Sequence, residues 1–347
     1  MNEDKTVQRK IEHIDLCINS EVEYSKSAGF EKYEFKHNAV TSISYEKLDL
    51  SRLFLDKKID FPFLISSMTG GANESLNINK KLAEVAACLN IPIGAGSQRH
   101  VLESNTYDES FSVLRKIAPN VPIFSNLGIS EVISLYNSNQ LNITNKLVEL
   151  LESDAFYIHL NTAQELFQVE GNKDFSNLLE SIAELVNTIK IPVFIKEVGN
   201  GIDYNAAKQL LELGVKGIDV AGSGGTNWQL IEMKRSGIIN EEFLEWGLPT
   251  TYCVKEVNKL KTEYDFFIIA SGGIKSGIDI AKSFALGADF AASANIILKS
   301  IINSGVDLTV KNIKDWFDDV KRVMFLTNAN RIEDLRNDKL IKIGELY

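Results

Sequence analysis

The stretch that decides the fold covers residues 266–292 and reads FFIIASGGIKSGIDIAKSFALGADFAA. It begins with the apolar run 266–270 and turns through a polar, glycine-containing segment. Residues 277–285 then have helical character, and after Gly287 a second apolar run covers 288–292. Short continuous apolar runs are typical of strands covered on both faces. A strand, a helix and a second strand in this order predict a parallel βαβ unit.

The same pattern recurs along most of the chain. Helical periodicity fills 178–189 and 206–213, closed by Pro192 and Gly214, and a further helix is expected near 252–260. Eight such units predict an α/β fold, a single (β/α)8 TIM barrel with its active site in the loops that follow the strands. A doubly wound sheet stays open as an alternative, because periodicity alone does not separate the two folds. The six other apolar runs are 63–65, 91–93, 121–124, 155–158, 193–195 and 217–220.

The barrel units leave extensions at both ends of the chain. Residues 1–60 precede the first unit, and those after about residue 312 follow the last one. No low-complexity linker or composition break separates either extension from the barrel. We therefore expect residues 1–347 to form one domain.

Charge and cysteine content narrow the classes of function. The chain has 347 residues with 37 Lys and Arg against 47 Asp and Glu, a net charge of −10. Such a chain is poorly suited to nucleic acids or anionic membranes, so any phosphate site must be local. Three scattered cysteines argue against a disulfide scaffold or a cysteine zinc site. No apolar stretch reaches the length of a signal or membrane-spanning segment, so we expect a cytoplasmic protein.

Small, polar and glycine residues gather where the predicted strands end. In a barrel these ends share one face, so the pattern predicts a ligand site there. Gly272-Gly273 and Ala294-Asn295 follow the last two strands, where backbone N–H groups and a helix N-terminus suit a phosphate. A tight turn is the alternative reading of the glycine pair. The strand-end segments are SSMTGG (66–71), GAGSQR (94–99), SNLG (125–128), HLNTAQE (159–165), KEVGNG (196–201), AGSGGTNW (221–228), SGGI (271–274) and SAN (293–295).

Charged and polar side chains at these strand ends are candidates for catalysis and for binding anions or metal ions. Lys196 closes an apolar strand, so its ammonium can meet an electron-rich ring or an anion, or form a Schiff base. An ion pair with Glu197 is the alternative. Glu165 suits magnesium. The alternative is that this carboxylate only stabilises a helix N-terminus, where acidic residues are favoured. In the N-terminal segment, Arg9 and His13 share a face if the segment is helical, although a solvated amphipathic terminus is the ordinary interpretation.

Taken in order, nine motifs resemble the type 2, FMN-dependent isopentenyl-diphosphate delta-isomerase family. Any one of them is weak, but the ordered set spans nearly the whole chain and is specific. The last ~35 residues contribute little to it. The motifs are RKIEHI (9–14), SMTGG (67–71), GAGSQR (94–99), SNLG (125–128), HLNTAQE (159–165), KEVGNG (196–201), GGTNW (224–228), SGGI (271–274) and ALGAD (285–289).

The resemblance implies an activity and its cofactors. The reaction is a reversible 1,3-allylic proton shift between isopentenyl diphosphate and dimethylallyl diphosphate, in isoprenoid biosynthesis. Reduced FMN would act as acid and base, NAD(P)H would supply the electrons, and Mg²⁺ would be required. The only partner expected is this small-molecule substrate, with no nucleic acid and no membrane, and we expect a homo-oligomer.

The resemblance also implies roles for individual residues. Gln164, His159 and Lys196 would be catalytic, and Glu165 would bind the metal. The N-terminal extension would supply substrate contacts. Gln164 and His159 lie nearest the reacting carbons and include no strong general acid, so the proton is assigned to the cofactor. Substrate would be held by Arg9, Lys10, Ser97, Arg99, His159, Asn161 and Gln164. FMN would be held by Ser67, Met68, Thr69, Ser97, Asn126, Lys196, Thr226, Gly273, Ile274, Lys275, Ala294 and Asn295.

Two other functions fit part of the pattern. An FMN-dependent 2-hydroxy-acid oxidase or dehydrogenase needs a histidine base beside a pair of arginines that clamp a carboxylate, and none of the four histidines has that setting. A non-catalytic flavin-storage or flavin-sensing protein would explain the flavin residues. It would leave Arg9, Lys10, Arg99 and Glu165 without a role.

Overall fold

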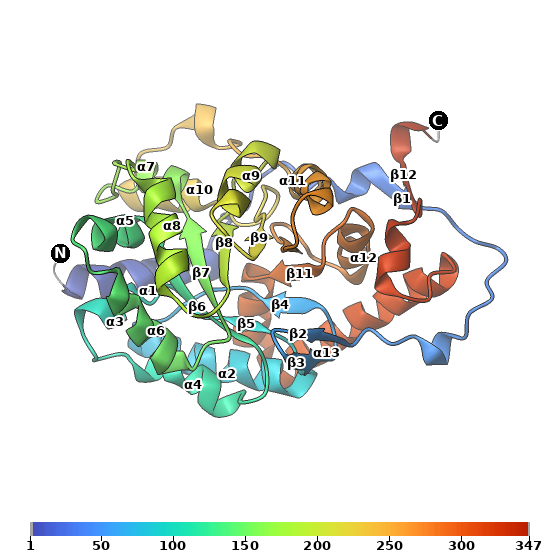
Figure 1. The fold of residues 1–347 in the computed structure, drawn as a ribbon, viewed down its shortest axis with the longest axis horizontal. Helices are drawn as coiled ribbons and strands as arrows, with labels where there is room; N and C mark the ends of the chain where they lie inside the picture. Colours follow the sequence, from blue (N-terminus) through green and yellow to red (C-terminus); the bar gives the residue numbers. More distant parts are fainter. Residues whose placement is uncertain (1–2, 346–347) are drawn as a thin grey trace.

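A computed structural model describes residues 3–345 and contains a closed barrel of eight parallel strands (Figure 1). The barrel closes because β11 pairs with β4, in the order β10-β11-β4-β5-β6-β7-β8-β9. The (β/α)8 prediction is confirmed, the doubly wound alternative is excluded, and each of the eight apolar runs contributes one strand. The strands are β4 (Phe63–Ile65), β5 (Ile93–Gly94), β6 (Ile123–Gly128), β7 (Ala155–Leu160), β8 (Val193–Glu197), β9 (Gly217–Asp219), β10 (Phe267–Ala270) and β11 (Phe290–Ser293).

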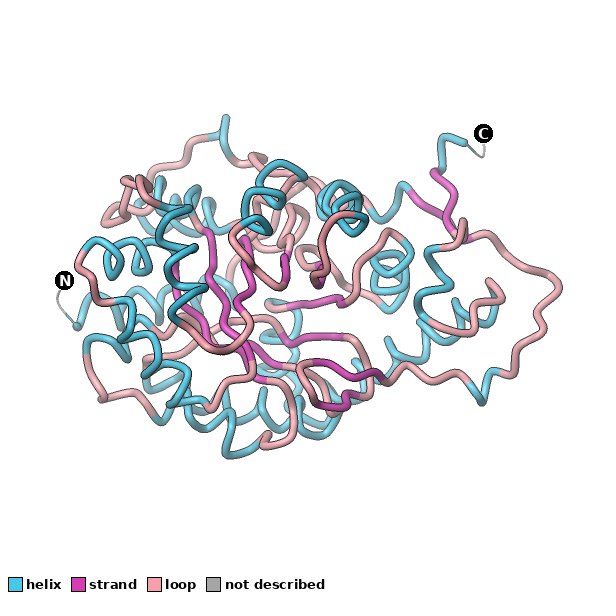
Figure 2. The backbone as a smooth tube through the Cα atoms, in the orientation of Figure 1, coloured by secondary structure: helices cyan, strands magenta, loops and turns pink. Residues whose placement is uncertain are grey.

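Helices surround the strands (Figure 2). Side-chain caps begin three of them: Asp203 accepts from Ala206 N, Asn227 from Leu230 N and Ser276 from Asp279 N. The helices are α1 (Glu3–Asn19), α2 (Asn73–Leu89), α3 (Arg99–Glu103), α4 (Glu109–Ile117), α5 (Ile129–Asn137), α6 (Thr144–Leu151), α7 (Thr162–Phe167), α8 (Leu178–Thr188), α9 (Tyr204–Glu212), α10 (Trp228–Ser236), α11 (Thr250–Asn258), α12 (Gly277–Ala285) and α13 (Asn295–Leu326). None of the described helices is long and apolar enough to cross a membrane.

A hairpin closes the amino-terminal end of the barrel. Strands β2 (Arg52–Phe54) and β3 (Lys57–Ile59) are joined by Leu55 and Asp56, both with positive φ, as a two-residue hairpin turn requires. The hairpin inserts Phe54 among the interior rings, with centroids 4.2 Å from Phe290 and 5.0 Å from Phe267. Because this end is plugged by aromatic side chains, a ligand must enter at the carboxyl ends of the strands.

The N-terminal extension reaches the open end of the barrel. Helix α1 packs on α10 and α13. The chain after α1 is bonded to the loop between β9 and α10: Tyr24 N donates to Gly225 O at 3.0 Å, and Asn227 N donates to Val22 O at 2.7 Å. Helix α1 and its basic residues therefore lie at the barrel mouth.

The remaining strands tie the two ends of the chain together. Strand β1 (Tyr33–Phe35) pairs antiparallel with β12 (Leu340–Lys342), at the right of Figure 1, away from α1. The C-terminal extension expected after about residue 312 begins within α13. Non-helical backbone at Gly305 divides α13 into two helical segments, the second of which ends at Leu326, and α13 packs on α2 and α12.

Candidate active site

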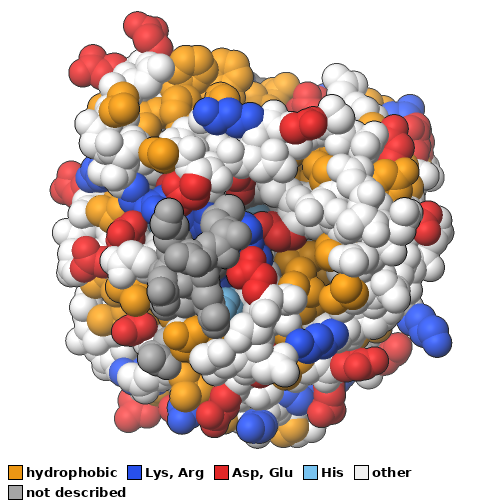
Figure 3. Space-filling model, turned by 90° about the vertical axis from the view of Figure 1, so that its left-hand side faces the viewer, with side chains coloured by type: hydrophobic (Ala, Val, Ile, Leu, Met, Phe, Trp, Pro, Cys, Tyr) orange, Lys and Arg blue, Asp and Glu red, His pale blue; other side chains and the backbone are white. Residues whose placement is uncertain are grey.

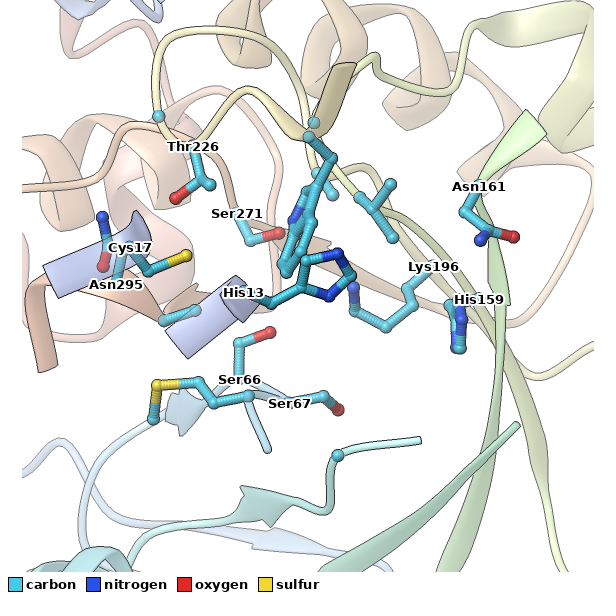
Figure 4. Close-up of a pocket in the computed structure, with 18 of the residues that line it drawn as sticks. His13, Cys17, Ser66, Ser67, His159, Asn161, Lys196, Thr226, Ser271 and Asn295 are labelled. Carbon is cyan, nitrogen blue, oxygen red and sulfur yellow. The ribbon is translucent and has the colours of Figure 1, made fainter. Parts of the chain in front are cut away.

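A pocket opens at the carboxyl ends of the barrel strands, and every residue that the sequence assigned to the site lines it. Segments after all eight barrel strands contribute, and α1 adds Arg9, Lys10 and His13 from across the mouth. Figure 4 shows His13 and Cys17 of α1 facing Ser67, Lys196 and the other strand-end side chains. Figure 3 looks onto this end, where acidic, basic and histidine side chains gather near the centre of the face.

Glycine backbones form one wall of the pocket. Gly273 has φ of +71°, and a Cβ there would lie 2.5 Å from Gly224 O. A Cβ on Gly225 would lie 2.6 Å from Gly273 N. The loops after β9 and β10 therefore pack backbone against backbone, which only glycine allows. The pair is thus more than a tight turn, because it brings two loops together beside the N-terminus of α13.

Buried polar atoms beside this wall have no protein partner. Within residues 3–345, Ser67 Oγ and both polar atoms of the Asn295 side chain are buried without a hydrogen bond. Unpaired buried polar groups cost free energy unless a ligand or water satisfies them. Asn295 begins α13 and Ser67 follows β4. A bound phosphate and a ring rich in hydrogen-bonding atoms would satisfy these groups, so the residues present fit FMN.

Lys196 lies inside the pocket at the end of β8. Burial lowers the pKa of its ammonium, while Asp219 on the neighbouring strand and Glu197 oppose that effect. The ion pair with Glu197 considered above is not the arrangement found. Lys196 Nζ donates to the Glu197 backbone oxygen at 2.8 Å, and the Glu197 carboxylate accepts the N–H groups of residues 198–200. The cation is left facing the pocket beside the place expected for the flavin ring.

Three basic residues gather at the opposite side of the pocket. Lys10 Nζ donates to Gly70 O and, at 3.2 Å, to Ser97 O. Burial, together with the charges of Arg9 and Arg99, lowers the pKa of Lys10 to about 7. Arg99 pairs with Glu131 at 2.7 Å and with Glu103 at 3.2 Å. Mutual repulsion among confined cations is relieved by an anion, so this group suits a diphosphate.

His159 is neutral in this pocket. Burial and then the charge of Lys196 lower its pKa to about 3. Asn126 Nδ2 donates to Ala95 O, so Asn126 Oδ1 accepts from His159 Nδ1 at 2.9 Å. The other ring nitrogen, Nε2, is then an acceptor, and His159 can donate to a diphosphate only if the ligand's charge returns a proton to the ring.

Glu165 is a buried carboxylate in the first turn of α7. It accepts from Asn161 Nδ2 at 3.1 Å and from Asn172 N at 2.7 Å. Asn161 Oδ1 is buried and has no hydrogen-bond partner among the described residues. No group of three His, Cys, Asp or Glu side chains within the described chain could hold a metal ion. Two oxygen donors beside a diphosphate site nevertheless fit Mg²⁺, which takes one or two carboxylates together with substrate phosphates.

A layer of residues behind the pocket was not found from the sequence. Glu232 of α10 is buried, and its Oε1 accepts from His13 Nε2 and Gln164 Nε2, both at 2.8 Å. Burial raises its pKa, but these bonds and that from Arg235 outweigh burial and lower it to about 2, so Glu232 is ionised. With its amide turned so that oxygen and nitrogen exchange places, Gln168 donates to Glu232 Oε1 at 3.3 Å and accepts from Arg9 Nη1 at 3.0 Å. The sequence pattern that could have indicated Glu232 is its spacing, because it lies four residues after Trp228 and therefore on the same helical face.

Comparison with known proteins agrees with this geometry. A family model described as FMN-dependent dehydrogenase matches residues 131–342. Among solved structures, a flavocytochrome b2 variant with sulfite bound has a TM-score of 0.70 at 18% identity, over 97% of this chain and 83% of that one. A lactate oxidase from Pediococcus acidilactici has a TM-score of 0.68 at 15% identity, over 99% and 94%. These structures share the fold, and the match to the family model places the chain in the FMN-dependent class of barrels.

Curated relatives define the family within that class. The isopentenyl-diphosphate delta-isomerase of Pelodictyon phaeoclathratiforme is 44% identical over 97% of both chains. The protein of the same name from Rickettsia canadensis is 38% identical over 96% of this chain and 97% of its own. The chain belongs to the FMN-dependent isopentenyl-diphosphate delta-isomerase family.

Proposed function

We propose that this protein is an enzyme that reversibly isomerises isopentenyl diphosphate to dimethylallyl diphosphate with the help of reduced FMN. The observation that carries the proposal is that one pocket has two separate regions suited to an anion. The glycine wall beside Asn295 suits a flavin phosphate, and Arg9, Lys10 and Arg99 on the other side suit a diphosphate. A pocket that held FMN alone would not need the second site.

FMN would be held along the carboxyl ends of the strands. Its phosphate would meet backbone N–H groups at Gly273–Lys275 and at Ala294–Asn295, with Thr226 beside them. Its ring would be held by Lys196, the segment Ser67–Thr69, Ser97 and Asn126. When bound and reduced, FMN supplies acid–base chemistry. The ammonium of Lys196 favours negative charge on the reduced ring.

The substrate's diphosphate would be held by Arg9, Lys10 and Arg99, with Ser97, His159 and Asn161 beside it. The negative charge of a diphosphate next to Lys10 opposes the burial and the repulsion from Arg9 and Arg99 that lower its pKa, so Lys10 becomes charged when substrate binds. We propose that Glu165 and Asn161 Oδ1 would hold Mg²⁺, which would neutralise negative charge on the diphosphate. Arg99 would exchange its carboxylate partners for phosphate oxygens.

The hydrocarbon end would lie against Gln164, His13 and Trp228. The His13 ring stands edge-on to Trp228 with centroids 5.2 Å apart, so this part of the pocket is partly apolar. Gln164 and His13 both donate to Glu232 Oε1, so the ionised carboxylate fixes the orientation of these two side chains at this end of the pocket. The absence of a strong acid among Gln164 and His159 still assigns the first proton to the cofactor.

The proposal includes further points that rest on the family resemblance. NAD(P)H would supply electrons, the enzyme would assemble as a homo-oligomer, and it would act in the cytoplasm. Residues 1–347 would work as one domain, with residues 1–60 contributing substrate contacts. The bonds from residues 22–24 to the β9–α10 loop and the place of Arg9 and Lys10 in the pocket support that last point.

An anaerobic assay tests the proposed activity. Purified protein with FMN, Mg²⁺, dithionite and isopentenyl diphosphate should produce dimethylallyl diphosphate. A protein that instead consumes oxygen while oxidising 2-hydroxy acids would be the alternative oxidase, whose barrel it shares. A protein that binds FMN and does neither would be a flavin store or sensor, and either result would refute the proposal.

A further inference from the structure

Arg235, near the end of α10, makes three ion pairs that join separate segments of the chain. Nη1 lies 2.5 Å from Glu232 Oε2 on its own helix. Nε lies 3.0 Å from Glu12 Oε2 on α1. Nη2 lies 3.2 Å from Glu170 Oε1 in the segment after α7. The planar guanidinium has five N–H donors in a fixed fork, so it can bind three carboxylates on different sides at once.

Each of these carboxylates either contacts a residue that lines the pocket or lies on the same helix as one. Glu170 Oε1 lies 3.8 Å from Arg9 Nη1. Glu232 receives hydrogen bonds from His13 and Gln164. Glu12 lies on α1, the helix that carries Arg9 and Lys10 into the pocket. Arg235 itself is not among the residues that line the pocket, so any effect on the reaction must pass through these neighbours.

We propose that Arg235 is a positioning residue that fastens α1 and the segment after α7 over the pocket, and so sets the diphosphate clamp before substrate arrives. This inference rests on the proposed function, because the anion that Arg9 and Lys10 would hold is the diphosphate of the substrate. Holding Arg9 and Lys10 in place in advance removes an ordering cost from substrate binding. Arg235 also neutralises acidic side chains that would otherwise repel an anion at the mouth.

Separate variants weaken the connections in turn. Glu12→Gln removes the ion pair between Arg235 and α1, and Glu170→Gln removes the pair between Arg235 and the segment after α7 together with the contact of Glu170 with Arg9. Arg235→Gln removes all three bonds, whereas Arg235→Lys keeps one charge without the fork. Asp15→Asn is the matched control, because Asp15 is an exposed acid on α1 whose carboxylate pairs with Asn19 on the same helix.

Hydrogen exchange measures the fastening without reference to activity. In the FMN-loaded protein, amides of α1 should exchange about threefold to fivefold faster in Glu12→Gln, as for a half-exposed ion pair, and faster still in Arg235→Gln. Saturating inorganic diphosphate with Mg²⁺ should reduce the difference from wild type. Asp15→Asn should exchange like wild type. Equal exchange in wild type, Glu12→Gln and Arg235→Gln, or equal acceleration in Asp15→Asn, would overturn the proposal.

Kinetics then separate positioning from a general structural role. Glu12→Gln should raise KM for isopentenyl diphosphate several-fold with kcat and FMN affinity retained, because bound diphosphate closes α1 by itself. Arg235→Gln should raise KM about tenfold or more, and Arg235→Lys should recover only part of this loss. A fall in kcat at unchanged KM in Glu12→Gln would refute the positioning role. If Arg235→Gln does not fold, Glu12→Gln and Glu170→Gln decide the question. An inactive wild type would refute the proposed function and leave the exchange test intact.

Discussion

Lys10 should make substrate binding depend on pH in a way that no solvent-exposed lysine would. Its ammonium is confined with Arg9 and Arg99, and burial together with these charges lowers its pKa to about 7 in the free protein. A bound diphosphate favours the charged form and raises that pKa. Binding therefore takes up a proton whenever Lys10 is neutral beforehand, and affinity falls as pH rises above 7.

The size of the effect follows from the pKa of about 7. At pH 7.5 about a quarter of the free molecules carry a charged Lys10, and at pH 9 about 1% do. Affinity should therefore fall about 25-fold between these two values if the complex keeps Lys10 charged. Phosphate groups lose their last proton near pH ~6, so the charge of the substrate changes little over this range.

Isothermal titration calorimetry of isopentenyl diphosphate into oxidised, FMN-loaded enzyme with Mg²⁺ measures both quantities. Buffers of different ionisation enthalpy should reveal uptake of about one proton at pH 9. Lys10→Arg, which cannot lose its charge, should bind with little pH dependence, and Lys10→Met should bind weakly at every pH. A wild-type affinity that does not change between pH 7.5 and 9, or a Lys10→Met variant with the wild-type slope, would refute this reasoning.

Three further predictions concern the metal and the flavin. Glu165→Gln should abolish the response of activity to Mg²⁺ and most turnover while FMN titration stays unchanged, since an amide lacks the charge that a hard cation prefers; turnover with the wild-type Mg²⁺ optimum would contradict it. Lys196→Met should weaken FMN binding and lower the flavin reduction potential, measured by dye-coupled titration, because a cation that favours the anionic reduced ring is lost. An unchanged potential would count against that role. Gly273→Ala should weaken FMN binding at least about tenfold with an unchanged circular dichroism spectrum, because the new Cβ meets Gly224 O in a left-handed backbone; wild-type FMN affinity would argue against the glycine wall as the phosphate site.

The barrel could be predicted because its strands are buried on both faces. Such strands appear in the sequence as short continuous apolar runs, and the structure has a strand at each of the eight. The strand ends differed by up to four residues, since hydrogen bonding in β6 continues into polar residues such as Ser125 and Asn126. The hairpin that plugs the barrel was not predicted. Its turn uses Leu55 and Asp56 with positive φ, whereas a glycine or asparagine normally marks such a turn.

The pocket-lining residues could be predicted from their place at strand ends and from the family motifs. The layer behind them could not. Glu232 and Arg235 lie on a helix with mixed polarity, and their partners Glu12 and His13 are more than 200 residues earlier in the chain. No local pattern encodes such contacts, because they depend on how α1 packs against α10. The roles of individual pocket residues stay predictions.

The central claim is that reduced flavin and this pocket move a proton without net oxidation. The most direct measurement is anaerobic turnover in deuterium oxide, with FMN reduced once by a substoichiometric amount of dithionite and the products followed by NMR. The account predicts many turnovers per electron pair, with deuterium entering dimethylallyl diphosphate and, by the reverse reaction, the remaining isopentenyl diphosphate. Consumption of reductant in proportion to product, or equal turnover with oxidised FMN, would contradict it.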